Sequence, residues 1–232
     1  MPGLIRSMLT VPGADPAATI LALRPSPRGF EVLLVQRNSR GYFGDLVVFP
    51  GGRVDSIDVP DGLGLYDDIS HRNAALREFA EETGILITTE GPVRAPQVRD
   101  DRYYRWLDDQ DLKPGTDDLV LVSRWVTPEA APRRFDTRFY VVSCVGAPEV
   151  EIDTAELLWH EWVAPEIALE RHERGEWPMF QPTLSHLRWL QRWDSIEDAI
   201  RSAEGADGRT LILPRRVEDG SLLPIHMPAE PL

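Results

Sequence analysis

Short apolar runs, separated by polar residues and turn signals, recur along the chain and predict β-strands. The first two runs, at 17–23 and 30–36, flank the turn sequence PSPRG and so predict a hairpin. Similar runs predict strands at 46–49, 86–89, 119–126, 138–145 and 157–163, and a further strand is expected at 209–217.

Helices are expected where apolar positions recur every three or four residues. One helix ends at Gly84, a favoured C-cap residue, and Ser70 is its expected N-cap. Others are expected at 99–109, at 166–174 after Pro165 in the favoured first position, at 182–192, and at 194–204 with Asp194 as N-cap. Strands that alternate with helices, through hairpins and crossovers, predict an α/β fold with a mixed sheet covered by helices.

Composition narrows the possible functions. The 232 residues are 42% hydrophobic and carry a formal charge of −13, with a pI near 4.8. This charge argues against a nucleic-acid groove and against electrostatic docking on anionic membranes. No apolar run reaches the roughly 18 residues of a membrane-spanning helix, and no signal peptide is expected. Cys144 has no partner for an intrachain disulfide, which fits a reducing compartment.

The segment REFAEETGI, at 77–85, gathers acidic residues on one side of a helix. Glu78, Glu81 and Glu82 stand three and four residues apart, so their side chains share a face. Like charges at this spacing cost stability, so folding alone does not explain them. A hard divalent cation, Mg²⁺ or Mn²⁺, does explain them, since it takes carboxylate oxygens and then holds substrate phosphates. A solvated acidic surface is the alternative.

The sequence FPGG, at 49–52, precedes this helix and follows an apolar run. Together the two segments resemble the Nudix hydrolase family, whose motif is Gly-x5-Glu-x7-Arg-Glu-U-x-Glu-Glu-x-Gly-U, where U is a bulky apolar residue. Residues 77–85 match its second half, while its first half is stretched by about eleven residues. The upstream acid is therefore Asp58, Asp67 or Asp68, or is absent.

The resemblance implies an α/β/α sandwich in a single domain over 1–232, with its core at about 15–170 and a C-terminal helical extension at 171–232. It also implies hydrolysis of a nucleoside diphosphate linked to another moiety. Glu78, Glu81 and Glu82 are then the expected metal ligands, together with a backbone carbonyl of Gly51 or Gly52. Arg77 is expected to orient a glutamate, with direct contact to phosphate as the alternative.

Members of the family place the general base either in the motif or on a distant loop. The distant candidates here are Glu151, Asp153 and Glu156, which precede the strand at 157–163. Exposed acids in an acidic turn are the alternative explanation for each. The expected catalytic residues are Arg77, Glu78, Glu82 and Glu156.

The stretch LLVQRNSRGYFGDLVVFPGG loosely resembles the signature of coenzyme A diphosphatases, and the order of later segments resembles their peroxisomal branch. This implies coenzyme A or acyl-coenzyme A as substrate, with Arg37, Arg40, Arg133 and Arg134 as candidate phosphate contacts or, alternatively, solvated surface residues. Other diphosphates (ADP-ribose, NADH, nucleoside triphosphates) and a non-catalytic nucleotide-binding module remain alternatives. A homodimer is possible, and the final Glu-Pro-Leu, unlike a peroxisomal signal, favours a cytoplasmic address.

Overall fold

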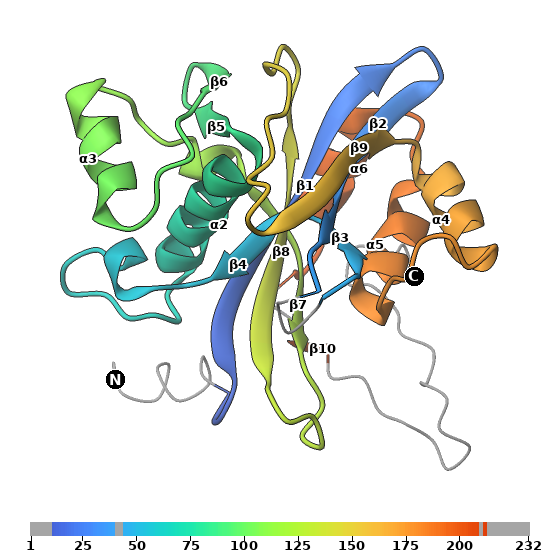
Figure 1. Cartoon of the computed structure of the whole chain (residues 1–232), viewed down its shortest axis with the longest axis horizontal. Coiled ribbons are helices and arrows are strands. Elements are labelled where there is room, and N and C mark those ends of the chain that lie inside the picture. The colour runs from blue at the N-terminus through green and yellow to red at the C-terminus, as the bar shows by residue number, and fades with distance from the viewer. Residues whose placement is uncertain (1–10, 40–43, 209–210, 213–232) are drawn as a thin grey trace.

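The computed structural model describes residues 11–39, 44–208 and 211–212 (Figure 1). The strands are β1 (Asp15–Ser26), β2 (Gly29–Arg37), β3 (Val47–Val48), β4 (Gly51–Arg53), β5 (Ile85–Thr88), β6 (Gly91–Arg94), β7 (Val120–Val126), β8 (Phe135–Ser143), β9 (Leu157–Val163) and β10 (Leu211–Ile212). The helices are α2 (Asp68–Thr83), α3 (Asp101–Asp109), α4 (Pro165–Glu173), α5 (Gln181–Leu190) and α6 (Ile196–Glu204), with short 3₁₀ turns η1 (Ser56–Asp58) and η2 (Thr116–Asp118).

The main sheet is mixed, as the alternation of strands and helices predicts. Its order is β10-β7-β8-β1-β2-β3, while β4 pairs with β1 and β9 pairs with β2. β1 runs parallel to β8 and antiparallel to both β2 and β4. β8 therefore occupies one edge of β1, while β4, which carries the glycine pair, and β2 follow one another along the opposite edge.

Side chains of β1 alternate between two hydrophobic layers, as the period of two in a strand requires. Ala18, Ile20 and Ala22 belong to the layer that contains α2, and all three are fully buried. Leu21 and Leu23 belong to the layer that contains α5 and α6. Helices therefore cover both faces of the sheet (Figure 1), which confirms the expected α/β/α sandwich.

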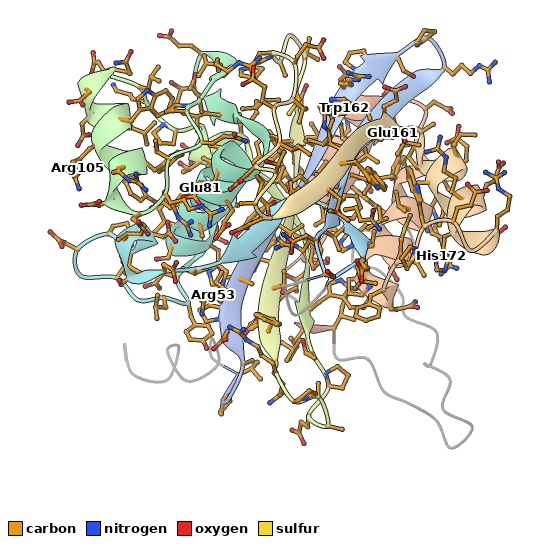
Figure 2. The ribbon with its side chains drawn as sticks, viewed as in Figure 1. Arg53, Glu81, Arg105, Glu161, Trp162 and His172 are labelled. Carbon is orange, nitrogen blue, oxygen red and sulfur yellow. The ribbon has the colours of Figure 1, made fainter. Side chains whose placement is uncertain are left out.

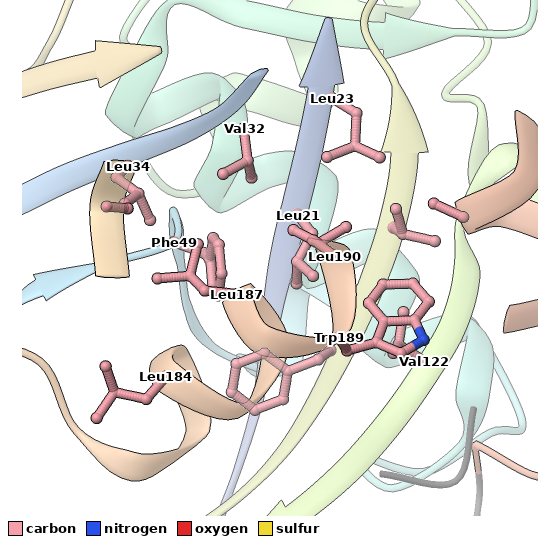
Figure 3. Packing of buried hydrophobic residues seen from close by; sticks show 14 of the residues in the cluster. Leu21, Leu23, Val32, Leu34, Phe49, Val122, Leu184, Leu187, Trp189 and Leu190 are labelled. Atoms are coloured by element: carbon pink, nitrogen blue, oxygen red, sulfur yellow. The ribbon is translucent and has the colours of Figure 1, made fainter. Parts of the chain in front are cut away.

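The C-terminal helices form the second outer layer. Leu187, Trp189 and Leu190 of α5 are fully buried, and Figure 3 shows them packed near Leu21 of β1 and Val122 of β7. Burial of such side chains stabilises a fold by about 1.5–3 kcal/mol each. Residues beyond 170 thus contribute directly to the core of the sandwich.

The predicted N-cap residues of two helices were wrong, because the residue at which a helix begins depends on backbone geometry that the local sequence does not show. Asp67, not Ser70, is the N-cap of α2, and the Ser70 hydroxyl donates instead to the Gly64 carbonyl at 3.0 Å. In α6 the N-cap is Ser195, one residue after Asp194, and its Oγ accepts from the Asp198 N–H. Gly84 ends α2 in the left-handed conformation, with φ of 68°, as expected.

The strands also differ in detail from the expectation. β4 and β6 were not predicted, because each is short and contains glycine or proline. Of the strand expected at 209–217, residues 211–212 form β10 beside β7, and the remaining positions lie outside the described residues. None of the helices within the described ranges has the length and apolar character needed to cross a membrane.

The long segment between β4 and α2 is tied down at its far end. Arg138 of β8 donates to Asp68 Oδ1 at 3.0 Å and to the Tyr66 carbonyl at 2.6 Å, and the Tyr66 hydroxyl donates to the Ala14 carbonyl at 2.6 Å. Burial opposes ionisation of Asp68, but hydrogen bonds and charge from Arg72 hold its pKa below the ordinary value. Asp68 and its neighbour Asp67 therefore anchor the start of α2.

Candidate functional site

Two glycines let β4 pack closely against both α2 and β1. A Cβ on Gly52 would lie 2.3 Å from the carboxylate carbon of Glu78, so only a residue without a side chain leaves room for that carboxylate. Gly51 has φ of 153°, and a Cβ there would lie 2.3 Å from the Ala18 carbonyl oxygen of β1. The FPGG sequence thus brings the β4 backbone directly against the acidic face of α2.

Arg77 lies buried among carboxylates of both the helix and the long loop. Its guanidinium makes two hydrogen bonds to Asp58, at 2.8 and 3.0 Å, and donates to the Arg53 carbonyl at 3.0 Å. It also lies 3.1 Å from Glu78 Oε1 and 3.3 Å from Glu81 Oε1. Burial opposes its charge, yet these carboxylates raise the pKa of Arg77. Arg77 is therefore placed to orient both glutamates.

Asp58 is distinguished from the other two candidates for the upstream acid. It is 1% exposed and belongs to η1, with five residues between it and Gly52, and it bonds directly to Arg77 of α2. Within the described ranges, Asp58 bonds Arg77, whereas Asp67 caps α2 and Asp68 pairs with Arg138. The stretched motif therefore keeps an acid at the expected distance from the glycines and inserts its extra residues after that acid.

Glu82 is buried at the centre of the site, between β4 and β2. Its Oε2 accepts from the Gly51 N–H at 2.9 Å, and its Oε1 lies 2.8 Å from Nη2 of Arg37. Arg37 also donates to the Gly51 carbonyl, and the Glu82 charge raises the pKa of Arg37. Arg37, expected to contact substrate phosphate, thus lies at the cleft but is bound to a glutamate.

The three glutamates of α2 are unusually weak acids here. Burial raises the pKa of Glu81 and of Glu82 to about 7, and it also raises the pKa of Glu78. The charges of Arg77 and Arg37 offset only part of this effect. Figure 2 shows Glu81 on α2 and Arg53 on β4, the two elements that carry the cluster. Additional positive charge beside the cluster would therefore stabilise the ionised form of these carboxylates.

The acids of the loop before β9 differ in their arginine partners and in whether they line the cleft. Glu156 lines the cleft, and its carboxylate lies 2.6 Å from Nη1 of Arg99. Arg99 also pairs with Asp153 and thereby lowers the pKa of that carboxyl, against the effect of burial. Glu151 pairs with Arg94 at 3.1 Å and is largely exposed. Of the three expected loop acids, Glu156 is the one whose side chain faces the cleft.

Backbone hydrogen bonds join this loop to the end of α2. The Glu151 N–H donates to the Thr83 carbonyl at 2.9 Å, and the Asp153 N–H donates to the Glu82 carbonyl at 3.2 Å. Segments about seventy residues apart in the sequence thus form one site. The sequence did not indicate Arg99, because nothing in a polar insertion marks which arginine meets which distant acid.

The remaining candidate arginines are dispersed. Arg133 lines the cleft, lies 3.2 Å from Asp15 and stacks over Phe135. Arg134 is not among the lining residues and donates to the Thr127 carbonyl at 3.0 Å and to the Pro12 carbonyl at 3.1 Å. Arg40 lies outside the described residues.

A cleft of about 1520 Å³ extends from the acidic cluster across the open end of the sheet. One end is charged and carries Arg37, Arg77, Glu78, Glu81, Arg99 and Glu156. The other end is lined by aromatic side chains from β7, β8 and the start of α5, namely Trp125, Phe135, Phe139 and Phe180. The shape fits a ligand with an anionic centre and a large, partly apolar group.

The glutamates of α2 and the carbonyls of β4 offer oxygen ligands suited to a divalent cation, although in this structure the glutamates pair with Arg37 and Arg77. Among the described residues, no three His, Cys, Asp or Glu side chains converge as a ready metal site. The guanidinium of Arg37, however, lies between the Glu82 carboxylate and the Gly51 carbonyl, so the site already accepts a cationic group between these oxygens. Carboxylate and carbonyl oxygens are the ligands that Mg²⁺ and Mn²⁺ prefer.

Comparison with known proteins agrees with this geometry. The NUDIX domain model matches residues 14–182, so the chain belongs to the Nudix family. Nudix enzymes act on small-molecule nucleoside diphosphates and generally use divalent metal ions. The crystal structure of a NUDIX hydrolase from Alicyclobacillus acidocaldarius superposes with a TM-score of 0.71 at 29% identity, covering 81% of this chain and 96% of that one.

Two curated relatives are similar in sequence. A Caenorhabditis elegans protein that carries the provisional name nudix hydrolase 7 is 30% identical over 78% of this chain. The human acyl-coenzyme A diphosphatase NUDT19 is 27% identical over 75% of this chain. The chain spans 62% of the length of the worm protein and 64% of the human one.

Proposed function

We propose that this protein is a metal-dependent Nudix diphosphatase that cleaves the pyrophosphate bond of a nucleoside diphosphate linked to another moiety. The observation that carries the proposal is the meeting of the acidic face of α2 with the bare backbone of Gly51 and Gly52 at the charged end of a large cleft. Burial raises the pKa values of these carboxylates, and such a cluster at a cleft is suited to a divalent cation.

Glu78, Glu81, Glu82 and the carbonyl of Gly52 are the proposed ligands of Mg²⁺ or Mn²⁺. When bound, such ions neutralise phosphate charge and lower the pKa of bound water. Arg77 orients Glu78 and Glu81 from its fixed place against Asp58. The proposal thus assigns Arg77 a positioning role, in agreement with its low exposure of 3% at the wall of the cleft.

The attacking water must lose a proton, and the chain offers acceptors at two places. Glu156 stands at the cleft with its side chain 38% exposed, where a carboxylate can meet both water and substrate. Glu78 and Glu82 are the candidates on α2. Arg99 neutralises Glu156 in part, and a substrate phosphate that binds Arg99 would leave Glu156 free to accept the proton.

Coenzyme A or acyl-coenzyme A is the proposed substrate class. Similarity to a protein named acyl-coenzyme A diphosphatase supports it, as does the aromatic end of the cleft, which is large enough for the group beyond the diphosphate. Arg133 at that end and Arg37 at the charged end are the proposed phosphate contacts. Arg40 and Arg134 remain weaker proposals, because the former lies outside the described residues and the latter outside the cleft lining.

A substrate panel tests the proposal. Coenzyme A, an acyl-coenzyme A, ADP-ribose, NADH and a nucleoside triphosphate are each incubated with Mg²⁺, with Mn²⁺ and with chelator, and products are separated by chromatography. Release of 3′,5′-ADP from the coenzyme A compounds, faster than any other turnover and abolished by chelator, is expected. Faster cleavage of another diphosphate would overturn the substrate class alone. Absence of turnover with either metal would overturn the proposal of enzymatic activity and favour a nucleotide-binding module.

Three features of organisation are proposed with this activity. The chain forms a single Nudix domain, with α5 and α6 completing the core beyond the motif-bearing part. A homodimer is tested by light scattering on the purified protein. A cytoplasmic location accords with a buried, unpaired Cys144 and is tested by fractionation of cells that produce the protein.

A further inference from the structure

Helix α3 lies outside the Nudix motif, yet one of its side chains reaches the buried acid behind the site. α3 belongs to the polar segment between β6 and β7. The Tyr104 hydroxyl donates to Asp58 Oδ1 at 2.7 Å. Burial and the Asp58 charge raise the pKa of Tyr104 far above its ordinary value, so the hydroxyl keeps its proton and can only donate to that carboxylate.

The four donors around Asp58 use the whole capacity of its carboxylate. Oδ1 accepts from Tyr104 at 2.7 Å and from Nε of Arg77 at 2.8 Å. Oδ2 accepts from Nη2 of Arg77 at 3.0 Å and from the Asp55 N–H at 2.8 Å. An ionised carboxylate offers about four acceptor sites. Removing the Tyr104 hydroxyl would leave one of these sites empty on a group that is 1% exposed.

Arg77 connects Asp58 to two of the glutamates on α2. Arg77 is held by Asp58 on one side and lies 3.1 Å from Glu78 and 3.3 Å from Glu81 on the other. A rotation of Asp58 toward other donors would move the guanidinium and, with it, the two carboxylates.

We propose that Tyr104 is a positioning residue, which acts through Asp58 and Arg77 to hold Glu78 and Glu81 in the arrangement that binds the divalent cation. The inference rests on the proposed function, because it takes these glutamates as metal ligands. It assigns a role in the site to a helix that the family motif does not contain.

The neighbouring residue on the same helix provides a matched control. Tyr103 is 1% exposed, and its hydroxyl makes no hydrogen bond within the described part of the chain. Its ring packs edge-to-face against Tyr104, with centroids 5.0 Å apart. Tyr103→Phe and Tyr104→Phe therefore remove the same atom from adjacent positions, but only the second change takes a donor from Asp58.

The test is calorimetric titration of Mn²⁺ into wild type, Tyr103→Phe and Tyr104→Phe, with thermal unfolding in chelator as a measure of the fold. Loss of an outer hydrogen bond in a metal site lowers affinity by about tenfold or more, so we expect Tyr104→Phe to bind Mn²⁺ about tenfold more weakly. Tyr103→Phe should match wild type. A purely structural role would lower the unfolding temperature and leave Mn²⁺ affinity unchanged.

Equal Mn²⁺ affinity of the two variants would overturn the positioning role while leaving the proposed function intact. The same conclusion would follow if Tyr104→Phe failed to fold although Tyr103→Phe folded. Absence of Mn²⁺ binding to wild type would overturn the metal site itself and this inference with it. The wild-type titration thus separates the two failures.

Discussion

Replacing Gly52 with alanine offers the sharpest test of the site, because it moves one carboxylate without removing any functional group. The added Cβ would lie 2.3 Å from the carboxylate carbon of Glu78 and 2.4 and 2.5 Å from its oxygens. Ordinary contact begins near 3.4 Å. Glu78 must therefore retreat by about 1 Å, a displacement that can cost roughly 100-fold in rate at a catalytic centre.

The effect on the fold should be much smaller than the effect on the rate. Gly52 does not have a positive φ, and the Cβ would meet the far end of a flexible side chain rather than backbone. A strained rotamer of Glu78 costs about 0.5–1.5 kcal/mol. A 100-fold loss in rate corresponds to about 2.7 kcal/mol in the activation free energy. The variant should therefore fold, with the loss concentrated in turnover.

The assay compares Gly52→Ala with Gly205→Ala, which serves as control. Gly205 ends α6 with φ of −77°, and a Cβ there would meet its nearest atom at 3.6 Å. For each variant, kcat with the best diphosphate of the panel, Mn²⁺ affinity and the unfolding temperature are measured. Wild-type kcat and Mn²⁺ affinity in a folded Gly52→Ala would refute the placement of Glu78 at the reaction centre.

Three other predictions follow from the same structure. Gly51→Ala should lower the free energy of unfolding in urea by about 3 kcal/mol, since the Cβ would lie 2.3 Å from the Ala18 carbonyl oxygen. An unfolding curve like that of wild type would contradict the close approach of β1 and β4. Glu81→Gln and Glu82→Gln should each lower kcat at least about 100-fold while retaining the fold by circular dichroism, and unchanged turnover in both would exclude them as metal ligands. Burial lowers the pKa of His186 to about 3, from about 6.5 in the unfolded chain. Its contribution to the free energy of unfolding is therefore complete above pH 6.5 and is lost as the pH falls toward 3. At pH 5 the loss amounts to about 2 kcal/mol. NMR of the imidazole should accordingly show no titration above pH 4, whereas a midpoint near 6.5 would show that the ring is accessible to water.

The local parts of the site could be predicted from the sequence, because they depend on the period of one helix. Residues three and four apart share a helix face whatever the rest of the chain does, so the grouping of Glu78, Glu81 and Glu82 follows from REFAEETGI alone. The alternation of strands and helices likewise predicted a mixed sheet, and the preference of glycine for the left-handed conformation predicted that α2 ends at Gly84.

Pairings between distant segments could not be predicted, because they depend on how the sheet brings elements together. Arg37, at the end of β2, meets Glu82 of α2 because β2 and β4 both pair with β1, and nothing in the sequence indicated this ion pair. Likewise, Asp58 was one of three candidates for the upstream acid of the motif, and only the fold shows that it contacts Arg77.

The sequence by itself therefore determined the family motif, the chemistry of its donors and the general architecture. The tertiary structure alone decided that Asp58 supports the site, that Arg99 faces Glu156, and that α3 supplies a hydroxyl behind the acids. The physical reason is the range of the interactions. Helix and strand periods act over a few residues, whereas buried ion pairs form wherever packing removes charges from water, and their partners lie tens of residues apart.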